Sequence, residues 1–422
     1  MKLTKKHLLN LSTKDQNLLL STMKEASRLW NDLIDLCYNA YLNNEKWLTG
    51  VDMQKLTQSK YNLHSDIITS ICQRMDSNRR TTLELRKQKP GAKFPYIKKD
   101  EITISGKKRQ FLKDNYISLT KLIKIKIPEE IDIYSSNIFH IVHRKSNFYL
   151  YLSYEQEEKP IVKTGIQCAV DLGEIHTIAA INTQGVKTIF TGRLARSFKR
   201  FRNKTHSQLA TKMKRCQENS RRYKKLQNIK NRTSKKTKNK LNDFYHHLTD
   251  KFIKECLIQK VDTIFIGNCK NVGQRTKQEH RLHRKNRQKM SQFEVGTIRN
   301  LISYKSQLSG IDMQSVSERW TTQTCPACGN HYKPTGRNYK CPKCQFIGHR
   351  DIVGCYNILE DNVPGVELSL IDGKIKGIHP IKVSTKVSTH LRSRRLRLSP
   401  CQVSNLTSYL RNQESQQFIA GE

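Results

Sequence analysis

Acidic residues are scarce in this 422-residue sequence. Asp and Glu number 36 against 77 Lys and Arg, which gives a formal net charge of +41. This imbalance excludes the surface of an ordinary metabolic enzyme and indicates a polyanionic partner. Long hydrophobic runs are also absent. No stretch of about 18 apolar residues occurs, and the first twenty residues lack the continuous apolar core of a signal peptide, so no membrane contact is predicted.

Apolar residues and cysteines are both limited. Hydrophobic residues make up 36% of the chain, below the roughly 45–50% of typical domains. A chain of this length can nevertheless fill more than one small core. Twelve cysteines are too few for a disulfide scaffold of this size, and their scatter is typical of a reduced, intracellular protein.

The first 160 residues combine two kinds of periodicity. Apolar side chains recur at helical spacing from about residue 14 until the break at Lys89-Pro90, so 14–90 is predicted to be mainly helical. From Phe94 the period shifts toward two, in short segments separated by Gly, Pro, Asn and Ser. We therefore expect helices inserted beside a small β-barrel or sandwich in residues 1–160.

Pro160 marks a change of pattern, and residues 161–320 are expected to form the first part of a second domain. Its predicted elements are, in order, strands at about 165–171, 175–182 and 187–191, a basic helical region at 193–260, a strand at 261–267, a helix at 295–308 and a strand at 311–317. This order predicts an RNase H-like mixed sheet with helices on its faces. An inserted module (321–348), a last helix (349–360) and a basic, partly disordered tail (361–422) complete the prediction. The fold class is thus α+β and multidomain.

Two CxxC pairs lie twelve residues apart, at Cys325, Cys328, Cys341 and Cys344. One such pair alone is compatible with a redox dithiol, but two at this separation favour four thiolates around one Zn²⁺. A closed set of four thiolates leaves no open coordination position, so this zinc is predicted to be structural and to stabilise a zinc ribbon.

Three acidic residues occupy the ends of predicted elements. Asp171 ends a strand, Glu318 follows a strand and Asp351 opens a helix. Each has a simpler interpretation, respectively a turn-initiating aspartate, a solvated charge and an N-cap. Together, however, they lie on elements that neighbour one another in this fold order. Their convergence would suit two Mg²⁺ ions acting on a phosphodiester, and the charge of the chain indicates nucleic acid.

The segment 193–240 contains 19 Lys and Arg and a single acid, Glu218. A solvated helical face is the usual interpretation of a charge run, but so many uncompensated like charges favour phosphate binding. The candidates for contact with a nucleic-acid backbone are Arg196, Arg200, Lys214, Arg221, Arg222 and Lys225.

Several motifs resemble the TnpB (OrfB-type) proteins of insertion sequences, relatives of compact type V CRISPR effectors. They are Asp171-Leu-Gly, TIFIG, WTTQTCPACG, the second CPKC and HRDIVGCYNIL. The resemblance covers about 165–360 and is looser at the N-terminus, where KFPYIKK and the helices resemble the family's wedge and recognition domains. It implies a prokaryotic, nucleoid-associated protein of the cytoplasm. It also implies an RNA-guided, Mg²⁺-dependent endonuclease with a RuvC-like site, a guide RNA from the transposon end and a double-stranded DNA target. A monomer is favoured.

The chain departs from the common family pattern at the second acid. Many members carry it on the strand equivalent to VDTIFIG, where this chain has Gly267 and Asn268. The local pattern resembles the subset in which the glutamate is moved to just before the ribbon, here Glu318, while Asp171 and Asp351 match the first and third acids. Weaker substitutes are Glu174 and Asp262. Two other functions stay open: a nuclease-dead RNA-guided repressor and a DNA strand transferase.

Overall fold

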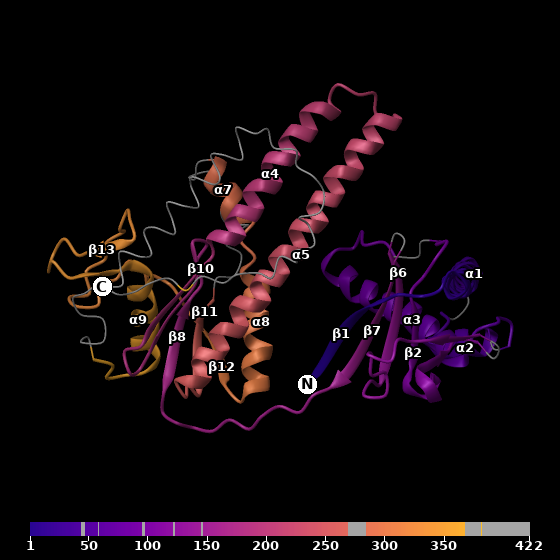
Figure 1. The fold of residues 1–422 in the computed structure, drawn as a ribbon, viewed down its shortest axis with the longest axis horizontal. Helices are drawn as coiled ribbons and strands as arrows, with labels where there is room; N and C mark the ends of the chain where they lie inside the picture. The colour runs from indigo at the N-terminus through magenta and orange to yellow at the C-terminus, as the bar shows by residue number, and fades with distance from the viewer. Residues whose placement is uncertain are drawn as a thin grey trace, which may run out of the picture. The chain divides into compact units, whose positions relative to one another are not determined.

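The computed structural model describes residues 1–43, 47–57, 59–94, 98–120, 123–144, 147–268, 284–367 and 381. It divides into two compact units, Met1–Lys159 and Pro160–Glu422 (Figure 1). Most of the predicted tail, 361–422, lies outside the described residues. No helix in the ranges given above is long and apolar enough to cross a membrane.

Three helices form the helical part of the first unit: α1 (Thr13–Leu42), α2 (Gly50–Thr57) and α3 (Ser65–Gln88). The Ser12 hydroxyl accepts a hydrogen bond from the backbone N–H of Asp15 and so caps the start of α1. Before Pro90, α3 ends with the Lys89 N–H donating to the carbonyl of Leu85. The apolar faces of these helices supply part of one core, in which Trp30 is fully buried.

The strands of the first unit form two antiparallel sheets. One has the order β1 (Lys2–Leu9), β7 (Asn147–Glu155), β6 (Ile138–Arg144) and β2 (Ile104–Lys107). The other joins β3 (Phe111–Leu112), β4 (Tyr116–Ser118) and β5 (Lys124–Lys126). The predicted barrel is therefore wrong for the described strands, because neither sheet closes. Phe139, Leu150 and Leu152 share one core with the helices, so the apolar side of the open sheet is covered without closure.

The second unit contains a mixed five-stranded sheet in the order β10 (Lys187–Thr191), β9 (His176–Asn182), β8 (Gln167–Asp171), β11 (Thr263–Gly267) and β12 (Asp312–Val316). The first three strands pair antiparallel, whereas β11 runs parallel to both β8 and β12. The carboxyl ends of β8, β11 and β12 therefore meet at one edge of the sheet. That edge holds Asp171 and Gly267 and leads into the segment with Glu318.

Helices cover both faces of this sheet because its central strands are apolar on both sides. Cys168 and Val170 of β8 pack in one core with α5 (Arg221–Ile258) and α8 (Val295–Ser309). Ala169, between them, faces the opposite core, which is formed with α9 (Arg350–Asn362). This alternation along one strand places α9 on the opposite side from α5 and α8, as Figure 1 shows.

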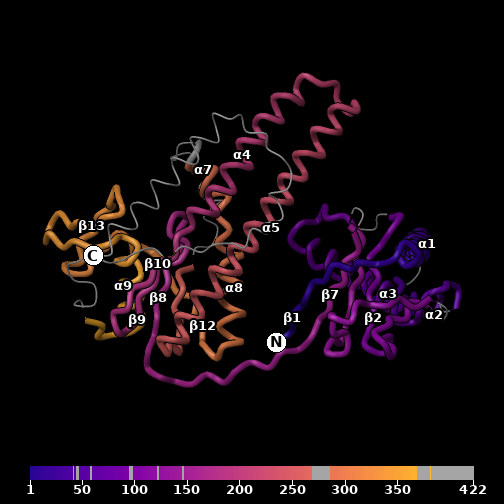
Figure 2. Tube along the Cα trace, viewed as in Figure 1, coloured from indigo at the N-terminus to yellow at the C-terminus, as the bar shows by residue number. Residues whose placement is uncertain are grey.

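The basic helical region consists of two helices. α4 (Arg193–Met213) and α5 lie side by side and extend well beyond the sheet (Figure 2). The chain turns between them, and the Ser220 hydroxyl caps α5 by accepting a hydrogen bond from the N–H of Tyr223 at 3.2 Å. A shorter helix, α7 (Arg284–Ser291), precedes α8, and the hairpin of β13 (Asn338–Lys340) and β14 (Ile347–His349) precedes α9.

Candidate metal centre and nucleic-acid interface

The four cysteines of the two CxxC pairs come together in one cluster. Sγ of Cys325 lies 3.6 Å from that of Cys344, and Sγ of Cys328 lies 3.6 Å from that of Cys341. All four sulfurs lie within 4.8 Å of one another. Thiolates placed about 2.3 Å from a central ion at tetrahedral angles have comparable separations. The cluster therefore fits one structural zinc ion, as the sequence predicted.

The three predicted acids approach one another from three elements. Asp171 is the last residue of β8, Glu318 follows β12 by two residues, and Asp351 lies in the first turn of α9. A cavity of about 240 Å³ is lined by two of them, together with apolar and threonine side chains: Asp171, Leu172, Met290, Phe293, Val295, Glu318, Thr321 and Thr322. The parallel pairing of β8, β11 and β12 produces this arrangement.

Two of these carboxylates lie close to the backbone of a glycine, where a larger residue would leave less space. A Cβ added to Gly267, at the end of β11, would lie 2.8 Å from Oε2 and 3.2 Å from Cβ of Glu318. The Glu318 side chain thus lies directly against the strand end where the sequence lacks an acid. Likewise, a Cβ on Gly354 of α9 would lie 3.2 Å from Oδ2 of Asp171. A larger side chain at Gly267 would displace Glu318, and one at Gly354 would press on Thr322, 2.9 Å away, as well as on Asp171.

The other two acids contribute to the electrostatic environment of Asp171. Burial, followed by the charges of Asp351 and Glu318, raises the pKa of Asp171 from 3.8 to about 7. Arg350 and Arg337 act in the opposite direction without cancelling this effect. Asp171 therefore carries a carboxylate whose ionised form is unfavourable until a nearby cation compensates it.

Asp351 has the opposite electrostatic environment. Burial alone would raise its pKa, but the hydrogen bond from His176 and the charge of Arg337 outweigh burial and lower it. Nδ1 of His176 donates to Oδ2 of Asp351 at 2.7 Å. Nη1 of Arg337 lies 2.6 Å from Oδ1 and 2.8 Å from Oδ2. Asp351 is thus held ionised and in a fixed orientation.

The sequence interpretation missed His176, His349 and Arg337, which all lie beside Asp351. Arg337 immediately precedes β13, so the ribbon brings this cation to the acid. No residue spacing indicates such a contact, because the residues come from separate elements. The two substitute acids lie elsewhere. Glu174 pairs with Arg196 at 3.0 Å, and Asp262 accepts backbone hydrogen bonds from Thr164 and Gly165 before β11 begins, away from Gly267.

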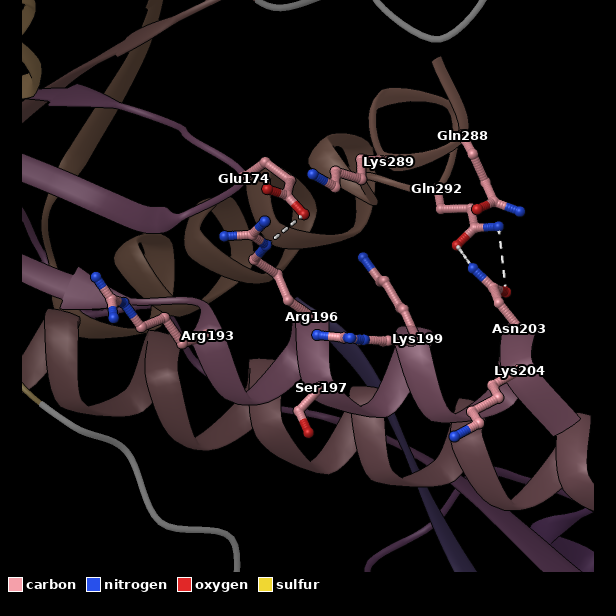
Figure 3. A pocket seen from close by; sticks show the side chains of 11 residues that line it. Glu174, Arg193, Arg196, Ser197, Lys199, Asn203, Lys204, Gln288, Lys289 and Gln292 are labelled. Atoms are coloured by element: carbon pink, nitrogen blue, oxygen red, sulfur yellow. Dashed lines mark hydrogen bonds and ion pairs between the residues drawn. The ribbon is translucent and has the colours of Figure 1, made fainter. Parts of the chain in front are cut away.

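The predicted cationic contacts divide into two groups. Arg196 and Arg200 line a cavity of about 760 Å³ between α4 and the segment of Gln288–Gln292, shown in Figure 3. Lys214, Arg221, Arg222 and Lys225 are exposed around the turn between α4 and α5 instead. The sequence interpretation missed further lining cations: Arg193, Lys199, Lys204 and Lys289. The helical spacing of Arg193, Arg196 and Arg200 was the signal that could have identified this face.

Comparisons with known proteins agree with these observations. Residues 151–273 match a family model described as "Probable transposase" (OrfB_IS605), and residues 296–358 match one described as "Cas12f1-like, TNB domain". A TnpB-like protein of Methanocaldococcus jannaschii is 26% identical over 137 residues, which are 32% of this chain and 48% of that protein. The chain therefore spans about half the length of the curated relative it matches.

Solved structures are similar to most of the chain. The Cas12f1–sgRNA–target DNA complex matches with a TM-score of 0.55 and 15% identity, covering 82% of this chain and 83% of that one. A mini-RNA-guided endonuclease, CRISPR-Cas_phi3, matches with a TM-score of 0.46 and 11% identity, covering 85% and 92%. The resemblance to the TnpB proteins is confirmed in sequence and the Cas12f1-like α+β fold in structure. The relocation of the glutamate stays a prediction.

Proposed function

We propose that this protein is an RNA-guided, Mg²⁺-dependent DNA endonuclease of insertion-sequence origin. The observation that carries the proposal is the convergence of Asp171, Glu318 and Asp351 from three distant segments. The raised pKa of Asp171, caused by burial and by the other two charges, means that the acids lie within electrostatic reach of one another. The sheet order β10-β9-β8-β11-β12 supports the RNase H-like, RuvC-type architecture predicted from the sequence.

The carboxylates fit magnesium because they offer hard oxygen ligands in a partly desolvated cluster of like charge. Asp171, Glu318 and Asp351 would hold the ions. Bound there, a pair of Mg²⁺ ions supplies an activated water and stabilises the leaving 3′-oxygen of a phosphodiester. The contact of Glu318 with Gly267 supports the idea that this glutamate replaces the acid missing from β11.

The chain's other residues orient these ligands and attract the substrate. His176 and Arg337 keep Asp351 ionised and fix its carboxylate. The cationic cavity beside α4 and the exposed cations near the α4–α5 turn provide two surfaces for phosphate backbones. The Cas12f1 structure that shares this fold contains an sgRNA and target DNA. We propose the same classes of partner here, a guide RNA and a double-stranded DNA.

A DNA strand transferase is the second candidate, because the matching family model is described as a probable transposase and carboxylate–metal sites of this kind support both hydrolysis and transesterification. The position of Glu318 against Gly267 argues against a nuclease-dead repressor, because such a protein would not need a third carboxylate there.

The test begins with the full chain purified with its RNA, which is sequenced and then used to program cleavage of a matching DNA in Mg²⁺. We expect a discrete RNA species and linear cut products, with no cutting by Asp171→Asn and unchanged RNA content in that variant. Joined DNA ends would instead identify a strand transferase. Specific binding without cutting would identify a repressor, and random cellular RNA would contradict guide binding.

A further inference from the structure

A second group of metal-binding side chains lies beside the acid cluster. One nitrogen of His176, one nitrogen of His349 and one carboxylate oxygen of Asp351 lie within 4.8 Å of one another. The two imidazole rings face each other with centroids 5.3 Å apart and planes inclined by 35°. Among the described residues, this is the one group of three potential ligands besides the four cysteines whose ligand atoms all lie within 4.8 Å of one another, a distance that the three acids Asp171, Glu318 and Asp351 exceed. We call it the His–His–Asp triad.

The triad comes from elements that the fold holds firmly. His176 begins β9 and is 7% exposed. His349 ends β14, and Asp351 follows in the first turn of α9. Because the ribbon hairpin and α9 are continuous in sequence, folding of the ribbon brings His349 to the edge of the sheet that carries His176. The ligands are therefore positioned before any ion arrives, which reduces the entropic cost of binding.

His349 has a feature that packing alone does not explain. It occupies the N-cap position of α9, yet its side chain makes no capping hydrogen bond. Its Nδ1 is buried and has no hydrogen-bond partner. Buried polar atoms are normally satisfied, so an imidazole with an unsatisfied nitrogen, beside another histidine and a carboxylate, points to a ligand-binding role. A purely structural role in orienting Asp351 accounts for His176 but leaves His349 without a function.

We infer that His176, His349 and Asp351 bind a divalent transition-metal ion of the Zn²⁺ type, and that this ion inhibits the nuclease by withdrawing Asp351 from Mg²⁺. Two imidazoles and one carboxylate suit zinc, whereas Mg²⁺ prefers an all-oxygen environment. In the binding step the Nδ1 proton that His176 donates to Asp351 is released, either to solvent or to Nε2 of the same ring, and the freed lone pair and the carboxylate oxygen then coordinate the ion. The inhibitory part of this inference rests on the proposed function, whereas the binding part does not.

Arg337 should lower the affinity of the triad for a metal ion. Its guanidinium contacts both carboxylate oxygens of Asp351 and competes with any cation at that carboxylate. Its side chain is 40% exposed, so it has room to move away when an ion binds. Replacing the cation with an uncharged side chain, Arg337→Gln, should therefore tighten zinc binding, the opposite of what loss of a ligand produces.

The binding test uses the full chain with its cysteine site already loaded with zinc, in Mg²⁺-free buffer. Equilibrium dialysis against Zn²⁺ with metal analysis should find a second equivalent in the wild type. Binding of that equivalent should weaken about tenfold or more in His349→Ala and strengthen in Arg337→Gln. It should not change in His247→Ala, a control histidine on α5 that is 43% exposed. Retention of the first equivalent verifies that each variant keeps a folded ribbon.

The functional test measures DNA cleavage at fixed Mg²⁺ with increasing Zn²⁺. The zinc concentration for half-inhibition should rise about tenfold in His349→Ala relative to that variant's own zinc-free rate. Absence of a second zinc equivalent, or equal zinc sensitivity of His349→Ala and wild type, would overturn the inference while zinc-free cleavage remained. If the proposed function is wrong instead, cleavage is absent without zinc, and dialysis still reports on the triad.

Discussion

The acid cluster and the α4–α5 helix pair use charge in opposite ways. The cluster holds three acids at one sheet edge, partly buried, so that burial and their mutual repulsion shift the pKa of Asp171 to about 7. In the helix pair the cations are distributed over two long helices. Most of the cations predicted to contact a nucleic-acid backbone are exposed. Charges in a desolvated site interact strongly, whereas exposed charges are screened by water and salt.

The two regions should therefore respond differently to mutation. In the cluster each carboxylate depends on the others, so the loss of one should remove the function. Along the helices each cation contributes a small and nearly independent share, so single losses should be tolerated. Arg337 of the ribbon is an intermediate case, because it is a single cation that contacts the buried acid Asp351.

The largest effect is expected for Glu318→Gln. Removing one carboxylate from the cluster should lower DNA cleavage about a thousandfold while guide-RNA binding stays at the wild-type level. Asp312→Asn is the matched control, because Asp312 begins the same strand, β12, and its carboxylate accepts a hydrogen bond from the Gln314 side chain. Measuring single-turnover cleavage and RNA content of both variants checks this. Near-normal cutting by Glu318→Gln would show that another group completes the cluster.

Removal of the structural zinc should have the next largest effect. Cys341→Ser should release the ion and unfold the ribbon, since its small core contains only three buried residues of the module, Cys325, Tyr339 and Cys341, beside Val353 of α9. Arg337 would then no longer reach Asp351, so cleavage should fall about a hundredfold, whereas the five-stranded sheet keeps its core. Metal analysis and limited proteolysis test this together. A ribbon that resists proteolysis without zinc would refute the structural role of the ion.

Stability should depend on pH through Asp171. Its pKa is raised in the folded state, from 3.8 to about 7, so the folded protein holds a proton that the unfolded chain releases. The free energy of unfolding should therefore fall as the pH rises from about 4 to 7, by at most about 4 kcal/mol. Asp171→Asn should lack this contribution and should be more stable than wild type at pH 8 in Mg²⁺-free buffer. Denaturant titrations at pH 5 and pH 8 measure the difference.

Adding Mg²⁺ to the same denaturant titrations tests whether the acid cluster binds the ion. If the acid cluster binds the ion, Mg²⁺ should restore stability to the wild type at pH 8 and leave Asp171→Asn nearly unaffected. Equal stabilisation of the two proteins would mean that Mg²⁺ acts elsewhere on the chain.

The smallest effect is expected for one exposed cation of the helix pair. Arg222→Ala should weaken nucleic-acid binding only slightly and reduce the slope of log affinity against log salt by about 1. Glu318→Gln should leave that slope unchanged, because in the proposed function the cluster would act in cleavage and not in backbone binding. A salt series of binding isotherms compares the two. A total loss of binding in Arg222→Ala would mean that the helix pair contains a concentrated site.

Local sequence patterns anticipated most elements of the second unit. The strand expected at 187–191 is β10 with the same bounds, and the helix expected at 295–308 is α8, Val295–Ser309. These segments have strong apolar periodicity or clear turn residues at their ends. In the first unit, the region predicted to be mainly helical, 14–90, contains α1 and then two separate helices, α2 and α3. Ser59 lies between them at a φ of 64°, a backbone conformation that the sequence there does not signal.

The incorrect prediction of a barrel shows what hydrophobic periodicity cannot determine. An alternating strand buries one face whether its sheet is open or closed, so the pattern cannot distinguish the two. Closure is unnecessary here, because Trp30 and its neighbours on the helices cover the apolar face beside Phe139. Likewise β1 was missed, since its sequence KLTKKHLL is mostly polar and exposed and its position depends on pairing with β7 over eight residues.

The sequence by itself identified the zinc ligands, the basic character of the chain and the three candidate acids. Residue spacing, composition and the ends of elements are local properties, so they can be recognised without the tertiary structure. Only the tertiary structure decided that Glu318 lies against Gly267, that Arg337 and His176 hold Asp351, and that His349 keeps an unsatisfied nitrogen beside them. Those contacts join residues up to 175 positions apart. They exist because the parallel strands bring distant chain segments to one edge, and no local preference encodes such a meeting.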